Sequence, residues 1–122
     1  LFRSKTDNII VEKSKAFAIR IINSYKYLCE EKHEYILSKQ LLRSGTSIGA
    51  NVKEAIRGQS KDDFIHKLNI SLKEASESEY WIELLFETDY ITKQQFDSLI
   101  GDCRELIKLL TSIIKTSRKE GK

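Results

Sequence analysis

The 122-residue sequence contains no proline, so no ring-imposed break interrupts a long helix. No apolar run approaches the ~20 residues that a membrane-spanning helix needs. No sustained alternation of apolar and polar residues between turn signals predicts a strand. Only two cysteines are present, which excludes a disulfide framework and suits a reducing cytoplasm. These absences leave an all-α, cytoplasmic protein without a membrane role as the class to test.

The N-terminal residues show no signal-peptide pattern. The chain starts at Leu1 rather than at a methionine, so whether its N-terminus is complete stays open.

The net charge of +3 is unevenly distributed along the sequence. Residues 1–61 contain twelve Lys and Arg against six Asp and Glu, whereas residues 62–122 contain nine against twelve. A basic first half and an acidic second half fit a weak nucleic-acid footprint, or two complementary surfaces for self-association. Ordinary solvated helix faces explain the same pattern, and the sequence does not decide among the three.

Apolar residues recur at spacings of three and four in four segments, which predicts helices over residues 8–31, 35–57, 61–88 and 93–117. Short connections make successive helices antiparallel, so the fold class is all-α, an up-down-up-down four-helix bundle forming one domain over residues 1–122. Ser60 is predicted to begin the third helix, and Thr92 with Gln95 forms a capping box for the fourth. Gly58 is predicted to end the second helix in a left-handed conformation.

The second predicted helix contains Gly45 and Gly49, each costing about 1 kcal/mol relative to alanine in a helix interior. A compensating gain is expected from close approach of a neighbouring helix. A phosphate-binding loop is excluded because Gly49 is followed by Ala50 and Asn51 rather than by Gly-Lys-Ser/Thr. The charges of this segment exclude a membrane dimerisation face.

The third helix is predicted to turn one face to the core, and that face includes a glutamate: Phe64, Leu68, Leu72, Ala75, Glu79, Ile82 and Phe86. A lone buried carboxylate is costly. We therefore expect a buried ion pair between Glu79 and Arg43, with Ser47 or Asn51 joining it. The alternative is a slight rotation of the helix that leaves Glu79 in water.

A search for chemical sites gives no catalytic residue, no metal ligand set and no cofactor, so the chain is not expected to be an enzyme. Glu30-x-x-His33 has the spacing of one di-iron ligand pair but lacks the second motif. Ser112-x-x-Lys115 matches a serine–lysine spacing near a helix end without an oxyanion site. Cys29 and Cys103 are expected to be buried thiols, too far apart along the bundle to form a bridge.

Three motifs carry a resemblance to a known family. They are Arg43-Ser44-x-x-Ser47-Ile48-x-x-Asn51-Val52-x-Glu54, Phe64-x-x-x-Leu68-x-Ile70-Ser71 and Glu74-Ala75-Ser76-Glu77-x-Glu79. With them, the chain resembles the bacterial four-helix-bundle proteins encoded in intervening sequences of large-subunit (23S) ribosomal RNA genes. The resemblance makes Arg43, Ser44, Ser47, Asn51, Glu54 and Glu79 the structural motif residues. One departure is Ala55, where similar proteins often have glycine.

This resemblance implies a ring-like homopentamer. Similar proteins include the accessory subunit of diversity-generating retroelements, which binds nucleic acid and a reverse transcriptase. We therefore expect a non-enzymatic oligomer that binds RNA or DNA through cations lying off the apolar faces: Lys13, Lys15, Arg20, Lys39, Lys53 and Arg57. The alternative is a structural or adaptor protein whose partner is itself or another polypeptide.

Overall fold

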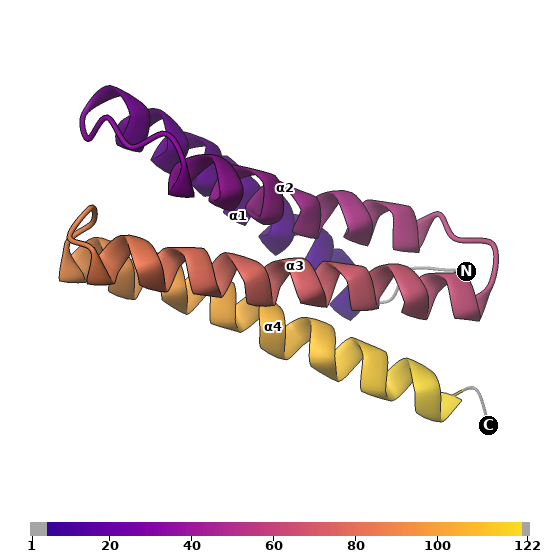
Figure 1. Cartoon of the computed structure of the whole chain (residues 1–122). Coiled ribbons are helices and arrows are strands. Elements are labelled where there is room, and N and C mark those ends of the chain that lie inside the picture. The colour runs from indigo at the N-terminus through magenta and orange to yellow at the C-terminus, as the bar shows by residue number, and fades with distance from the viewer. Residues whose placement is uncertain (1–4, 121–122) are drawn as a thin grey trace.

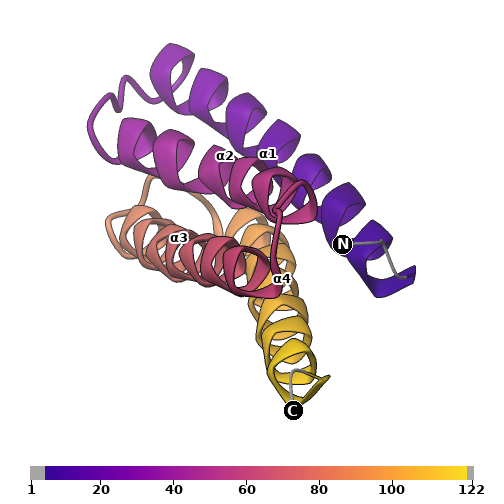
Figure 2. The ribbon, with the colours of Figure 1, turned by 90° about the vertical axis from the view of Figure 1, so that its right-hand side faces the viewer.

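The structure, a computed structural model, describes residues 5–120 as four helices: α1 (Lys5–Glu30), α2 (Leu37–Ile56), α3 (Lys61–Glu87) and α4 (Lys93–Glu120). The helices alternate in direction along one long axis (Figure 1). α2 packs extensively on α1 and on α3, α3 packs on α4, and a smaller contact between α1 and α4 closes the bundle. Viewed from the end that holds both termini, α1 and α4 spread apart (Figure 2). The predicted all-α, up-down four-helix architecture is confirmed.

The first residues of α3 and α4 are set by polar side chains that accept hydrogen bonds from the first backbone N–H groups of each helix. The Asp63 N–H donates to the Ser60 hydroxyl over 3.1 Å at the start of α3. At the start of α4, the Thr92 N–H donates to the Gln95 side-chain oxygen over 2.8 Å, and the Gln95 N–H donates to the Thr92 hydroxyl over 3.1 Å. Both predicted caps are therefore confirmed. In the described part of the chain, no helix has both the length and the apolar character to cross a bilayer.

The start of α2 differs from the predicted residue 35 because the Glu34 side chain occupies the first donors of the helix. One carboxylate oxygen accepts from the N–H groups of Ile36 and Leu37, and the other accepts from the N–H of Ser38 over 2.7 Å. The Ser38 hydroxyl donates back to the Glu34 carbonyl over 2.7 Å. Burial acts to raise the pKa of Glu34, but the three backbone donors outweigh it and lower that pKa. A buried carboxylate thus acts as the cap of α2.

The prediction that Gly58 adopts a left-handed conformation is wrong. Among the described residues no glycine has positive φ, and the left-handed positions are His33 at φ 54° and Asp89 at φ 68°. A Cβ at Gly58 would lie 3.0 Å from the Ala55 carbonyl oxygen and 3.3 Å from the Asp63 Cβ. The glycine at this turn therefore permits a close approach of backbone segments rather than an unusual dihedral angle.

At three positions of α3, the residue that faces the core is the one before the residue that was predicted to do so. Its buried residues are Phe64, Leu68, Ser71, Ala75, Ser78, Ile82 and Leu85. Leu72, Glu79 and Phe86 are only partly buried. Phe86 stacks instead on Phe96 of α4, with ring centroids 4.4 Å apart. Serines occupy the side facing α2, where the Ser71 hydroxyl donates to the Ile48 carbonyl and the Ser78 hydroxyl hydrogen bonds with that of Ser44.

The two glycines of α2 face α1, which confirms the predicted close helix approach. A Cβ on Gly45 would lie only 2.8 Å and 2.9 Å from the two γ-carbons of Ile21. A Cβ on Gly49 would lie 3.3 Å from the Ser14 hydroxyl and 3.4 Å from the Ser14 carbonyl oxygen. Buried Ile21 and Ser14 therefore pack directly onto the α2 backbone.

Candidate functional site

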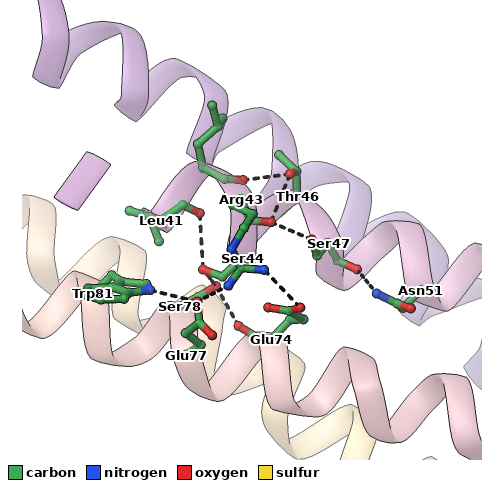
Figure 3. Close-up of polar contacts among 11 residues, drawn as sticks. Leu41, Arg43, Ser44, Thr46, Ser47, Asn51, Glu74, Glu77, Ser78 and Trp81 are labelled. Atoms are coloured by element: carbon green, nitrogen blue, oxygen red, sulfur yellow. Dashed lines mark hydrogen bonds and ion pairs between the residues drawn. The ribbon is translucent and has the colours of Figure 1, made fainter. Parts of the chain in front are cut away.

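Arg43 of α2 lies at the centre of a polar cluster between α2 and α3 (Figure 3). Its guanidinium forms ion pairs with Glu74 over 3.3 Å and with Glu77. The Trp81 indole N–H donates to the same Glu77 oxygen over 3.1 Å. This donation lowers the pKa of Glu77, and Arg43 lowers it further against the opposing effect of burial. The cluster links the two helices by charge-assisted hydrogen bonds.

The predicted buried pair of Arg43 with Glu79 is therefore wrong. The Arg43 side chain is 51% exposed and bonds to Glu74 and Glu77, which lie on the α2 side of α3. Glu79 lies on the α4 side, where Arg104 Nε donates to it over 2.8 Å. The physical reason is the rotation of α3 that places Ser78 rather than Glu79 in the core.

Fully buried hydroxyl groups provide a second set of links between α2 and α3. The Ser44 and Ser78 hydroxyls hydrogen bond over 2.8 Å, and the Ser71 hydroxyl donates to the Ile48 carbonyl over 2.8 Å. Glu74 Oε1 is buried and has no hydrogen-bond partner among the described residues. The hydroxyl bonds and the Arg43 ion pairs together make this cluster a junction between α2 and α3.

The other motif residues take different roles. The Ser47 hydroxyl donates to the Arg43 carbonyl over 2.6 Å, and the Asn51 amide donates to the Ser47 carbonyl over 2.9 Å. These bonds stay within α2, so neither side chain joins an ion pair as expected. Glu54 reaches α3 and pairs with Lys67 over 2.9 Å. Glu74, Glu77 and Trp81 were not assigned from the sequence, although both glutamates belong to a quoted motif.

The six candidate nucleic-acid contacts fall into two groups. Lys13 pairs with Glu105 of α4 over 3.1 Å, and Arg20 pairs with Asp102 of α4 over 2.6 Å. Their charge is thus offset within the chain. The remaining four are exposed, and none forms an ion pair with another residue in the described range: Lys15, Lys39, Lys53 and Arg57. Lys53 lies in the last turn of α2, and Arg57 is the residue that caps its C-terminal end.

The charge of the bundle differs between its two ends. We call residues 5–17, 47–74 and 107–120 the termini end, and residues 18–46 and 75–106 the turn end. The termini end contains twelve Lys and Arg against seven Asp and Glu, whereas the turn end contains seven against eleven. In the folded chain, the basic and acidic residues are thus separated partly between the two ends of the bundle, and not only between the two halves of the sequence.

The thiols and histidines form no shared site. In the stretch covered by the structure, no group of three or more metal-ligating side chains occurs. His33 Nδ1 lies 3.1 Å from the Tyr35 hydroxyl, and the Cys29 thiol is half-buried beside the Glu34 carbonyl. Cys103 is buried and donates to the Ala75 carbonyl over 3.3 Å. Burial raises the pKa of Cys103 to about 12, so its thiol stays protonated and unreactive.

No curated protein matches the chain. A solved structure is very similar: a crystal structure at 1.70 Å from Bacteroides thetaiotaomicron VPI-5482, described as a protein with unknown function from the S23 ribosomal protein family. It is 58% identical, with a TM-score of 0.89, and the match covers 90% of this chain and 98% of that one. Residues 6–112 match the family described as 23S rRNA-intervening sequence protein. The chain therefore belongs to the 23S rRNA-intervening sequence protein family.

Proposed function

We propose that this chain is a non-enzymatic helical bundle that forms a homo-oligomer and binds RNA or DNA through exposed cations at its termini end. The observation that carries the proposal is the excess of positive charge at that end, together with the unpaired cations Lys53 and Arg57. Clustered cations bind the phosphate backbone without requiring a base-specific contact. The pentameric ring is proposed from the family resemblance alone.

Self-association has separate support from large apolar side chains left exposed on the single chain. Ile9 and Ile22 of α1 are each 39% exposed, and Ile19 is 52% exposed. A second copy that covers these side chains would remove apolar surface from water, which favours association. Light scattering on the full chain at tens of micromolar is expected to give an oligomer, and a monomer there would contradict this part of the proposal.

The second candidate function is a structural or adaptor protein that binds a polypeptide. The turn end exposes Tyr35 to 56%, Ile36 to 75% and Tyr80 to 53% in a region with an excess of carboxylates. An acidic surface disfavours phosphate, whereas exposed aromatic and aliphatic side chains are typical anchors at protein interfaces. This surface therefore fits a protein partner better than it fits a nucleic acid.

The experiment measures binding of a labelled duplex to the wild type and to K53Q/R57Q by fluorescence anisotropy at several salt concentrations. Each lost phosphate contact reduces the slope of log affinity against log salt by about 0.9. We therefore expect weaker binding by the double variant and a slope smaller by about 1.8. The control K26Q removes one exposed charge from the turn-end half of α1 and should leave affinity within about twofold. Absence of binding by the wild type even at low salt would favour the adaptor function.

A further inference from the structure

A groove between α3 and α4 at the termini end combines an apolar floor with a basic rim. Its volume is about 340 Å³, near the lower limit for small-molecule sites. Leu72 of α3 and buried Ile114 of α4 supply the apolar surface. The remaining lining residues are polar or cationic: Asn69, Thr111, Lys115, Arg118 and Lys119.

The three cations of this groove are unpaired among the side chains that the structure describes. Lys115, Arg118 and Lys119 are exposed, and no ion pair joins any of them to a side chain that the structure describes. Asp62 and Asp63 of α3 are exposed at the same end of the bundle, and neither forms an ion pair with a cation of the groove. The positive charge is therefore available to a ligand, although it also complements the C-terminal dipole of α4.

This chemistry discriminates among anions. Inorganic phosphate would use the cations and leave the apolar floor in water. A fatty acid would need a longer apolar channel than two side chains provide. A duplex presents phosphates but keeps the faces of its bases stacked inside. An unpaired nucleotide presents both an apolar base face and a phosphate, and the Asn69 amide offers a donor and an acceptor to a base edge.

We propose that this groove binds one unpaired nucleotide unit, with its base or sugar on Leu72 and Ile114 and its phosphate held by Lys115, Arg118 and Lys119. The inference deepens the proposed function, on which it rests for the claim that the nucleotide belongs to a single strand. The same chemistry would accept a free nucleoside monophosphate, so the test separates the two sources.

The test measures binding of a single-stranded oligonucleotide, a duplex, AMP and inorganic phosphate to the full chain. Two variants change the groove in different ways. R118Q/K119Q removes two charges from its rim. T111W fills the groove from an exposed position without changing charge. K26Q, at the other end of the bundle, is the control for loss of a distant charge, and urea midpoints check that every variant is folded.

We expect R118Q/K119Q to weaken single-strand binding at least fivefold and to lower the salt slope by about 1.4, since each contact to a single strand contributes about 0.7. T111W should weaken single-strand binding at least threefold while duplex binding, which depends on Lys53 and Arg57, is unchanged. K26Q should bind every probe as the wild type does. In NMR spectra, AMP should shift the amide signals of Leu72 and Ile114.

The possible failures are distinguishable. If both groove variants bind the single strand like the wild type while K53Q/R57Q loses duplex binding, the groove inference is wrong and the proposed function stands. If no oligonucleotide binds but AMP shifts the groove signals in the wild type and not in T111W, the groove binds free nucleotide and the proposed function is wrong. If inorganic phosphate gives the same shifts at the same affinity, the apolar floor is unused and the nucleotide assignment is overturned.

Discussion

Helix α1 has two neighbours, and it contacts them by different physical means. Towards α2 it packs buried Ser14 and Ile21 against a backbone left uncovered by Gly45 and Gly49. Towards α4 its charged contacts are two ion pairs whose side chains are 39–50% exposed. A groove of about 300 Å³, with Arg20 at its rim, lies on the α4 side. One interface depends on shape, whereas the other depends substantially on exposed charge.

The difference between the two interfaces of α1 indicates which of them opens more easily. Close packing is insensitive to salt and intolerant of added volume. Exposed ion pairs contribute little each and are screened at high ionic strength. Figure 2 shows α1 and α4 diverging towards the termini, so these two helices separate along part of their length. We therefore expect the α1–α4 interface to open before the α1–α2 interface.

Added volume at the α1–α2 interface should give the largest effect. The new methyl group in G45A meets three atoms of the stiff, β-branched Ile21 within 3.2 Å. Overpacking of about 3 kcal/mol exceeds the helix-propensity gain of about 1 kcal/mol, so unfolding should cost about 2 kcal/mol less. Urea denaturation provides the measurement. The matched control is G101A in α4, where nothing lies within 4 Å of the new methyl group, and it should be stabilised by up to about 1 kcal/mol.

The turn that joins α1 to α2 contains Glu34, whose contribution to the stability of the α1–α2 hairpin should depend on pH. Folding lowers the pKa of Glu34, so its ionised carboxylate stabilises the fold above its ordinary pKa. That contribution disappears as pH falls through the lowered pKa of the folded state. E34Q should lose about 1.5 kcal/mol at neutral pH, and its deficit relative to the wild type should shrink in acid. Equal deficits at pH 7 and pH 3 would contradict this assignment.

The buried Ser71 hydroxyl tests how strongly α2 is attached to α3, on the side of α2 away from α1. S71A removes the donor to the Ile48 carbonyl, which retains its helical hydrogen bond, so the loss should be about 1 kcal/mol. The loss should be the same in low and high salt because the site is buried. S76A, on the exposed side of α3, is the control and should change little.

The smallest effect is expected at the α1–α4 interface. R20Q removes the bond to Asp102 and a second bond to the Ser98 carbonyl. Exposed pairs of this kind contribute about 0.5 kcal/mol, so the variant should be destabilised by that amount at low salt and match the wild type at about 1 M salt. A salt-independent loss of more than about 2 kcal/mol would show that the contact is not a screened surface pair.

The sequence predicted the parts of the fold that depend on periodicity and short-range chemistry. The four helices, the Ser60 cap and the close approach at Gly45 all follow from local spacing and residue type. The level of Arg43 along α3 was also nearly right, since it was expected to pair with Glu79 and instead contacts Glu74 and Glu77, which lie within about one and a half turns of that residue. The rotation of α3 was wrong, because Leu72 and Phe86 flank Glu79 at helical spacing and serine resembles a surface residue.

The candidate site was less predictable because it depends on contacts between distant segments. The neutralisation of Lys13 and Arg20 requires carboxylates of α4 that are more than seventy positions away. The groove between α3 and α4 requires the rotation of both helices. No local pattern contains either relation, and a charge count by sequence halves conceals the basic C-terminal part of α4.

The two cysteines provide a built-in chemical reporter for each hairpin. Cys29 belongs to the α1–α2 hairpin and is partly exposed, whereas Cys103 is sealed between α3 and α4 by its bond to Ala75. A disulfide reagent should therefore modify Cys29 in the folded protein and reach Cys103 only during excursions that expose the interior of the second hairpin. The modification rate of Cys103, measured at several salt concentrations and temperatures, would report how often the α3–α4 hairpin opens, without any engineered label.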